Sequence, residues 1–238
     1  MFIYTKEKII VTNKVYLIDC VEFMKTKPDN YFELAIVDLA YGKLCNLEDG
    51  RTKHNGWNSG EFWNKASKGW NNKIPDKKYF DELFRISQNQ IIWGGNYFVE
   101  FLKGSSGWVF WDKGQRNFSL ADGELAFTSF NKALRVFKYS RSLSNFKDIK
   151  IHPTQKPVAL YKWLLTNYAK EGDKILDTHE GSGSHRIACY ELGFDHEGCE
   201  KDKDYWKAQE KRFELEKAKI DNRMYIPDDQ NLLFVGVV

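Results

Sequence analysis

Short apolar runs separated by polar turns recur along the chain and indicate alternating strands and helices. Residues 34–37 (Leu-Ala-Ile-Val) form a continuous apolar run, which is typical of a strand covered on both faces of a parallel sheet. The pattern predicts further strands at residues 14–19, 90–93, 108–111, 125–128, 175–176 and 194–199, and helices at residues 79–86, 158–169, 187–192 and 203–219. This alternation favours an α/β fold with a mostly parallel sheet.

A glycine-rich turn lies between the strand at 175–176 and the helix at 187–192. Gly181 and Gly183 allow the backbone to approach a ligand closely, and the start of the following helix offers free N–H groups. Glu200 ends the next strand, 19 residues after Gly181, close to where an acid binds ribose hydroxyls in such βαβ units. This stretch therefore predicts a nucleotide-like ligand over the turn.

Two residues narrow the choice of ligand. Arg186 stands where a dinucleotide fingerprint has its third glycine, and Asp177 at the mouth of the turn would repel a pyrophosphate. A ligand with a ribose, a positive centre and no phosphate fits better, which favours S-adenosylmethionine (SAM) over NAD. A strand–turn–helix without any ligand remains the alternative.

Two other predicted strands also end on an acid. Asp19 follows the run at 14–18, and Asp38 follows the run at 34–37. Open α/β sheets bind their ligands at the carboxyl ends of their strands, so both acids are candidate site residues. Residues 43–76 then lose all clean periodicity and are interpreted as a long surface loop.

Composition permits a nucleic-acid partner without demanding one. The 238 residues carry a formal net charge of +3 and a pI near 8.5, and 16% of them are aromatic. Basic residues alternate with tryptophans in the loop, which suits a nucleic-acid contact, and the basic segment at 132–150 suits contacts with phosphates. The candidates for nucleic-acid contact are Trp57, Lys65, Lys132, Arg135, Lys138 and Arg141, although a solvated charged surface explains such runs as well.

The other compositional features are negative. The four cysteines show no Cys-x-x-Cys spacing and no pairing with histidine, so neither a zinc site nor a disulfide framework is indicated. No apolar run reaches membrane length and no signal peptide is visible, so we expect a cytoplasmic protein without a membrane partner.

Several segments together resemble one family, the beta-class amino-methylating (adenine-N6 or cytosine-N4) DNA methyltransferases. Residues 38–41 (Asp-Leu-Ala-Tyr) resemble the catalytic Asp-Pro-Pro-Tyr, and residues 152–157 match His-Pro-Thr-Gln-Lys-Pro. Residues 177–184 resemble the cofactor loop Asp-Pro-Phe-x-Gly-Ser-Gly-Thr, and Asp19-Cys20 matches a strand end beside the cofactor adenine. The resemblance spans residues 14 to about 215, with the motifs in the beta order.

The resemblance implies a Rossmann-like SAM-dependent methyltransferase fold with a mostly parallel seven-stranded sheet and a circularly permuted motif order. It implies one domain over 1–238, with a loop at 43–76, a target-recognition region at 113–151 and a cofactor-binding part at 152–215. The implied cofactor-binding residues are Asp19 and Cys20 near the adenine, Glu200 at the ribose, Asp177, Gly181, Ser182, Gly183 and Ser184 at the methionine end together with Asp38, and Thr154 and Lys156 near the carboxylate.

The implied reaction transfers a methyl group from SAM to adenine N6 in duplex DNA, with Asp38, Leu39, Ala40 and Tyr41 as the catalytic motif. The Asp38 carboxylate would accept the exocyclic N–H, and Tyr41 would stack on a base flipped out of the duplex. Leu39 and Ala40 stand where the family has two prolines, which fix φ and lack a donor. Two alternatives follow: a SAM- and DNA-binding homologue with little or no activity, and a cytosine-N4 enzyme.

The carboxyl-terminal tail contains a short peptide of a different kind. Residues 230–234 (Gln-Asn-Leu-Leu-Phe) resemble peptides that bind bacterial replication clamps, although an apolar strand explains them equally well. The expected partner is double-stranded DNA. If the peptide at 230–234 is not a strand, the replication sliding clamp is a second expected partner. We expect the protein to be a monomer or a homodimer. No nuclease motif is visible.

Overall fold

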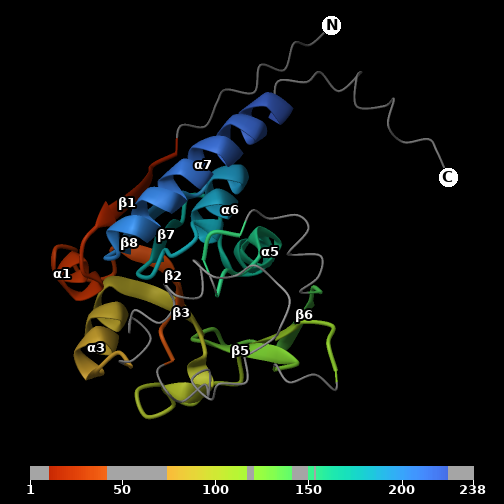
Figure 1. Cartoon of the computed structure of the whole chain (residues 1–238). Helices are drawn as coiled ribbons and strands as arrows, with labels where there is room; N and C mark the ends of the chain where they lie inside the picture. The colour runs from red at the N-terminus through yellow and green to blue at the C-terminus, as the bar shows by residue number, and fades with distance from the viewer. Residues whose placement is uncertain (1–10, 42–73, 117–120, 141–149, 153, 225–238) are drawn as a thin grey trace, which may run out of the picture.

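A computed structural model of the chain describes residues 11–41, 74–116, 121–140, 150–152 and 154–224 (Figure 1). Strands and helices alternate through most of this part, as the apolar pattern predicts. The elements are β1 (Asn13–Leu17), α1 (Cys20–Lys25), β2 (Phe32–Asp38), α3 (Lys77–Ile86), β3 (Ser87–Trp93), the 3-10 turn η2 (Gly95–Tyr97), β4 (Trp108–Asp112), β5 (Gly123–Thr128), β6 (Arg135–Lys138), α5 (Val158–Tyr168), β7 (Lys174–Asp177), α6 (Ser184–Leu192), β8 (Asp195–Glu200) and α7 (Lys203–Met224).

The strands form one mixed sheet in the order β1-β8-β7-β2-β3-β5-β4-β6. Only β5 pairs antiparallel with its neighbours, and the other pairs in the described part are parallel. The described sheet has eight strands, one more than the seven strands that were expected. The unpredicted strand is β6, whose four residues are too few to show a period and lie in the basic segment interpreted as weakly patterned.

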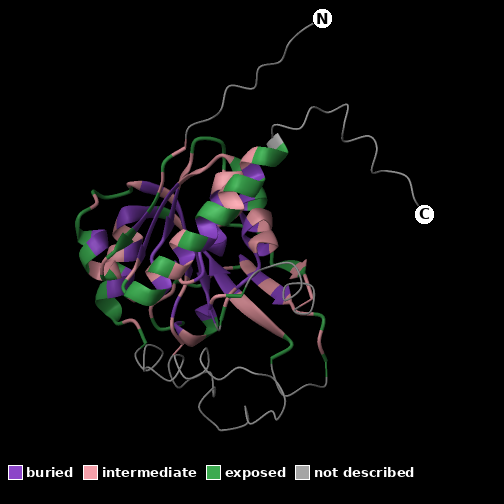
Figure 2. Ribbon diagram, turned by 45° about the horizontal axis from the view of Figure 1, so that its top comes forward, coloured by how far each residue is buried: buried purple, intermediate pink, exposed green. Residues whose placement is uncertain are grey.

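From Leu34 to Val37 the side chains of β2 alternate between two hydrophobic clusters, which explains why this apolar run is continuous. Phe32, Ala35 and Val37 join the cluster formed with α1 and α3, whereas Leu34 and Ile36 join the cluster formed with α5 and α6. The helices therefore cover both faces of the sheet, as Figure 1 shows. Figure 2 shows the buried strands between helices whose outer sides are exposed.

The elements begin and end where local chemistry requires. Asp76 caps α3 by accepting a hydrogen bond from the backbone N–H of Tyr79, and the buried residues of that helix follow its predicted spacing. Strand β1 ends at Leu17 rather than at Asp19, because Asp19 instead caps α1 through the backbone N–H of Val21.

The order of the strands creates a switch point between β7 and β2. From β7 the chain passes through α6 to β8 on one side, and from β2 it passes through α3 to β3 on the other. At such a point the loops after the two neighbouring strands diverge and leave a ligand-binding crevice at their carboxyl ends. Asp177 ends β7 and Asp38 ends β2, so the fold places both acids at this position.

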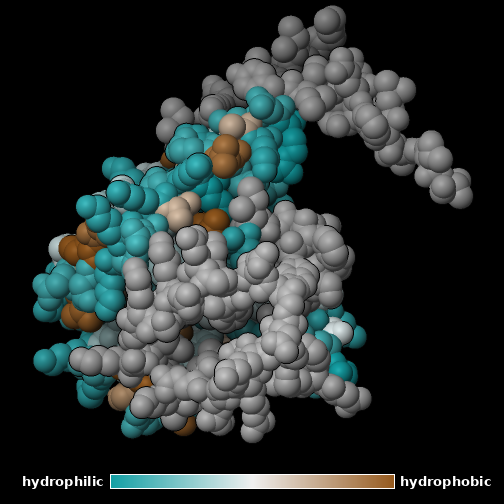
Figure 3. Space-filling model, in the orientation of Figure 1, coloured by the Kyte–Doolittle hydropathy of each residue, from teal (hydrophilic) through white to brown (hydrophobic). Residues whose placement is uncertain are grey.

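The surface of the long helix α7 is largely hydrophilic on the side that Figure 3 presents. Among the described helices, none is long and apolar enough to cross a membrane. Some predicted features lie outside the described residues: most of the loop at 43–76, Trp57, Lys65, Arg141 and the clamp-like peptide at 230–234.

Candidate active site

Four acids line the carboxyl edge of the sheet on four adjacent strands. Asp19 follows β1, Glu200 ends β8, Asp177 ends β7 and Asp38 ends β2. The backbone N–H of Ile18 donates to the Glu200 carbonyl at 3.1 Å, which holds the first two strand ends together. The edge is thus strongly acidic, which suits hydroxyl and amino donors or a cationic ligand and opposes phosphates.

Asp38 lies at the centre of a buried polar cluster. Its Oδ1 accepts a hydrogen bond from the Tyr41 hydroxyl at 2.8 Å, and its Oδ2 is 2.6 Å from Lys156 Nζ. Only 3% of the Lys156 side chain is exposed, so this ion pair is shielded from water. The structure therefore brings together residues of two motifs separated by more than a hundred positions.

The ion pair of Asp38 is one part of a longer chain of alternating charges. Lys156 Nζ is also 3.0 Å from Glu124 Oε2 on β5, and Glu124 Oε1 is 2.6 Å from Lys113 Nζ. Sequence reasoning missed Glu124 and Lys113, because an acid in a half-buried strand and a lysine after β4 carry no local signal. Only the pairing of β4 with β5 places them beside Asp38, in the predicted catalytic motif.

The shared lysine affects the two carboxyl groups differently. Burial raises the pKa of Asp38, and the single ammonium of Lys156 only partly opposes that rise. Burial acts to raise the pKa of Glu124 as well, but Lys156 and Lys113 together outweigh it and lower that pKa to about 2. Both effects are consistent with the geometry, since Glu124 contacts two ammonium groups and Asp38 one.

Leu39 and Ala40 occupy different environments. The Leu39 side chain is 4% exposed and belongs to the hydrophobic cluster that contains Phe80 and Phe98, whereas Ala40 is half-buried. The bulk of Leu39 therefore lies in the core between β2 and α3. Leu39 follows directly after the end of β2, and its side chain joins the same cluster as Ala35 and Val37.

Tyr41 is held between two residues near the end of β3. Its ring stacks on Tyr97 with centroids 5.1 Å apart, and it lies so close to Gly94 that a Cβ there would overlap the ring. Gly94 also has φ of +69°, a conformation that other residues adopt only with strain. Tyr97 therefore occupies one face of the Tyr41 ring.

The glycine-rich turn is shaped by left-handed glycines and by Glu200. Gly181 and Gly183 have φ of +52° and +75°, and the Gly181 N–H donates to Glu200 Oε2 at 3.0 Å. Glu200 Oε1 accepts the backbone N–H of Asp202 at 2.8 Å, and burial raises the Glu200 pKa. The turn and Glu200 are thus joined by a direct hydrogen bond, and each carboxylate oxygen retains a further acceptor position.

Helix α7 supports this turn from behind. Arg212 Nη1 donates to the Ser182 carbonyl at 2.8 Å and to Ser184 Oγ at 2.9 Å, and the guanidinium is buried. A Cβ on Gly183 would come within 3.3 Å of the Gln209 side chain. The sequence analysis missed Arg212 and Gln209, because the pattern of α7 predicts only a charged helix and not which of its residues are buried.

Asp177 and Thr178 are buried, and His179 is partly buried. Asp177 is 1% exposed, and its two oxygens accept the His179 backbone N–H at 2.9 Å and contact His185 Nδ1 at 3.1 Å. The Thr178 hydroxyl lies 2.6 Å from the Tyr79 hydroxyl of α3 and 2.9 Å from His179 Nδ1. Thr178 and His179, which replace the family's proline and phenylalanine, have hydrogen-bond partners supplied by the fold.

The remaining candidates for cofactor contact lie around the turn. Thr154 is exposed, and its Oγ1 is 3.1 Å from His152 Nδ1. The His152 ring packs against Tyr205 with centroids 4.4 Å apart, and burial lowers its pKa to about 4. Cys20 begins α1 and is partly buried, and burial raises the pKa of its thiol to about 12, so it is a neutral thiol at pH 7.

Three of the predicted nucleic-acid contacts lie in the described part of the chain. Lys132 precedes β6, and Arg135 and Lys138 belong to it. Arg135 and Lys138 are exposed on this edge strand. Lys132 Nζ donates to the Asn167 carbonyl at 2.8 Å and lies 4.7 Å from the centroid of the Tyr168 ring.

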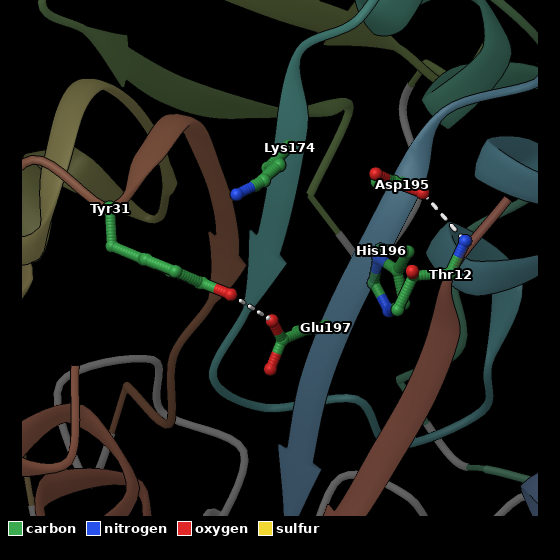
Figure 4. A pocket seen from close by; sticks show the side chains of 6 residues that line it. All are labelled: Thr12, Tyr31, Lys174, Asp195, His196 and Glu197. Carbon is green, nitrogen blue, oxygen red and sulfur yellow. Dashed lines mark hydrogen bonds between the residues drawn. The ribbon is translucent and has the colours of Figure 1, made fainter.

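A separate small pocket lies at the opposite edge of the sheet, where the strands begin (Figure 4). Its volume of about 160 Å³ is below the several hundred Å³ usual for ligand sites. Tyr31 donates to Glu197 across it, and Lys174 Nζ lies 4.5 Å from the centroid of the Tyr31 ring. Because it is far along the strands from Asp38 and Glu200, we do not assign it to the candidate active site.

The fold, with acids and a glycine-rich turn at its switch point, is that of the Rossmann-like methyltransferases. The sequence profile of the DNA methylase family of N6 and N4 methyltransferases matches residues 2–211, so the chain belongs to this family. The resemblance of the motifs is thereby confirmed at the level of the family.

Curated relatives match over part of the chain. The type II methyltransferase M2.DpnII of Streptococcus pneumoniae is 42% identical over 65 residues, which are 27% of this chain and 24% of the relative. The type II methyltransferase M.HpaI of Haemophilus parainfluenzae is 35% identical over 81 residues, which are 34% of this chain and 26% of the relative. The matched segments thus span about a quarter of each relative's length.

Solved structures share the fold over most of the chain. A protein from Thermus thermophilus, described as a putative DNA modification methylase and solved with SAM, has a TM-score of 0.55 at 15% identity, covering 86% of this chain and 94% of that one. The SAM complex of M1.HpyAVI has a TM-score of 0.53 at 20% identity, with coverages of 85% and 100%. The cytosine-N4-specific PvuII methyltransferase has a TM-score of 0.55 at 14% identity, with coverages of 90% and 93%.

Proposed function

We propose that this chain is a SAM-dependent DNA methyltransferase that methylates the exocyclic N6 of adenine in duplex DNA. The observation that carries the proposal is the Asp38 carboxylate, which the fold holds at the switch point beside Tyr41 and next to the glycine-rich turn. Family membership and the SAM complexes of the Thermus thermophilus and M1.HpyAVI proteins support the same reaction class.

The residues around the turn fit SAM. The acceptor groups there are acidic and include Glu200 and Asp19, which suits ribose hydroxyls, an adenine amino group and a nearby positive charge. Gly181 and Gly183 present backbone at the surface of the turn without side chains. When bound, SAM supplies an electrophilic methyl group on a sulfonium. In the proposed site Glu200 and Asp19 would hold its adenosine part, and residues 181–184 would hold its methionine part.

Asp38 has the position and charge to activate an amino group. The exocyclic nitrogen of adenine is a poor nucleophile, because its lone pair is shared with the ring. A carboxylate that accepts its N–H increases electron density on that nitrogen, and the raised pKa of Asp38 makes this oxygen a good proton acceptor. Lys156 keeps the carboxylate oriented, and Tyr41 stacks on the flipped base in place of Tyr97.

The choice of adenine over cytosine rests on the residue type at position 38. Aspartate here resembles the adenine-N6 enzymes of the family, whereas serine is usual in cytosine-N4 enzymes.

Duplex DNA is proposed as the partner, with exposed Arg135 and Lys138 on β6 as phosphate contacts. Each lost phosphate contact should reduce the salt dependence of DNA binding by about one unit of slope.

The test is methyl transfer from labelled SAM to mixed-sequence duplex DNA, followed by mass analysis of the nucleosides. Asp38→Asn runs beside the wild type and should lose at least about a hundredfold in rate, since general-base contributions are typically 10²–10⁴-fold. Activity of the wild type should fall as pH falls through the raised pKa of Asp38, because the protonated carboxyl group no longer accepts the N–H. N4-methylcytosine as the product would reject the adenine assignment.

Ala40→Pro and Leu39→Pro/Ala40→Pro address the variant motif. Because Leu39 is packed in the core, its replacement also removes buried contacts, and the single Ala40→Pro variant controls for that loss. Product only from a proline variant would identify the natural chain as a weakened homologue. Absence of product from every variant, with unchanged folding, would reject the proposed activity.

A further inference from the structure

A cluster of three metal-ligand side chains lies buried between α6 and β8. His185 and Cys189 are four residues apart and therefore lie on the same face of α6, and His196 is the second residue of β8. One nitrogen of each imidazole and the Cys189 Sγ all lie within 4.8 Å of one another. All three side chains are at most 1% exposed, and Cys189 forms no disulfide.

Each imidazole is anchored by a carboxylate through one nitrogen only. His185 Nδ1 is 3.1 Å from Asp177 Oδ2, and His196 Nε2 is 2.9 Å from Glu180 Oε2. Within the described residues, the other two nitrogens, His185 Nε2 and His196 Nδ1, are buried without a hydrogen-bond partner. A histidine that binds a metal through one nitrogen usually donates its other N–H to a carboxylate in this way.

The cluster joins two elements directly below the glycine-rich turn. Asp177 ends β7, Glu180 belongs to the turn, and His185 is the second residue of the helix that the turn begins. The same two acidic side chains lie directly behind the imidazoles, where they can accept the imidazole N–H groups.

We propose that His185, Cys189 and His196 form a binding site for a divalent ion of the Zn²⁺ type. Two imidazoles and a thiolate are donors that zinc prefers, and three protein ligands leave the fourth tetrahedral position to a water molecule. Binding forms the metal–sulfur bond and releases the Cys189 thiol proton to solvent, so one proton appears for each ion bound. The bound ion holds α6 against β8 and thereby supports the turn.

Packing alone gives a contrasting expectation. His185 stacks on Tyr161 with centroids 4.8 Å apart and contacts the edge of His196 at 5.1 Å. An aromatic cluster held only by these contacts binds no ion and gains nothing from Zn²⁺.

The experiment uses the full chain, stripped with a chelator and then titrated with Co²⁺ and Zn²⁺. The expected result is one ion per chain, a cobalt–thiolate absorption band, a melting temperature that rises with Zn²⁺ concentration, and release of about one proton per ion. Cys189→Ser should lose the band. Cys199→Ser, which changes another buried thiol that donates to the Thr178 carbonyl, should keep it.

Two further measurements keep the test decisive if Cys189→Ser folds poorly. Glu180→Gln retains all three ligands and should weaken Zn²⁺ binding by about 10–100-fold, because it changes only the carboxylate behind His196. X-ray absorption of the zinc-loaded wild type should give one sulfur and two imidazole nitrogens around the metal. A chain that binds no ion at micromolar Zn²⁺, or that binds it with a sulfur-free shell, overturns the proposal.

Discussion

Replacement of Lys156 by methionine tests the buried charge cluster most directly. Lys156 Nζ contacts Asp38 Oδ2 at 2.6 Å and Glu124 Oε2 at 3.0 Å, and the side chain is 3% exposed. Methionine fills a similar volume but leaves two buried carboxyl groups without their shared cation. Removing one partner of a buried ion pair typically destabilises a protein by about 3–5 kcal/mol.

This loss is a large fraction of the stability of an ordinary domain, which is roughly 5–15 kcal/mol. For a chain of this size, each kcal/mol lowers the melting temperature by about 2–4 °C, so the expected decrease is roughly 6–20 °C at neutral pH. Urea unfolding monitored by circular dichroism measures the difference directly. Lys162→Met is the matched control, because its pair with Glu191 at 2.9 Å is partly exposed and contributes at most about 1 kcal/mol.

The pH dependence of this loss has a definite sign. In the variant Glu124 keeps its pair with Lys113 at 2.6 Å, whereas Asp38 is buried without its ammonium partner. The folded-state pKa of Asp38 therefore rises further above the ordinary value near 4, and stability is lost as pH rises through it. In the wild type the Glu124 pKa of about 2 contributes stability above pH 4.5 that is lost as pH falls towards 2. The gap between wild type and variant should therefore be largest near pH 8 and narrow towards pH 5.

A gap that stays constant between pH 8 and pH 5, or one no larger than that of Lys162→Met, would refute this account of the cluster. Either result would mean that the lysine is replaceable by any side chain of its size, and that Asp38 does not depend on it.

Three further variants probe contacts around the site. Gly94→Ala should displace the Tyr41 ring and cost about 1–2 kcal/mol for the left-handed backbone, measured by thermal unfolding and by the change in tyrosine near-ultraviolet circular dichroism. Arg212→Met leaves a carbonyl and a hydroxyl of the glycine-rich turn without their donor, so unfolding free energy should fall by about 1–3 kcal/mol; an unchanged value would show that α7 does not support the turn. Tyr79→Phe removes the hydrogen bond to Thr178 and should lower the free energy of unfolding in urea by about 0.5–1.5 kcal/mol. An unchanged free energy would show that the Thr178 hydroxyl does not depend on Tyr79.

Local patterns were sufficient to predict the central part of this protein. The continuous apolar run at 34–37 and the alternation through 174–200 predicted β2, β7, α6 and β8, and the structure confirms these elements. They are encoded by features that lie close together in sequence, namely apolar runs that need two covered faces and glycines that need a left-handed backbone. The motifs at the ends of these strands likewise identified the family.

Tertiary structure alone decided which charged groups meet. Glu124 and Lys113 reach the Asp38 cluster only because β5 runs antiparallel between β3 and β4, and Arg212 reaches the turn only because α7 packs behind it. Such contacts join residues that are tens to more than a hundred positions apart in the sequence. The sequence around a single charged residue in a strand or helix therefore does not indicate which distant residue it will contact. The buried cluster of His185, Cys189 and His196 has the same origin, because its three side chains come together only when α6 packs against β8.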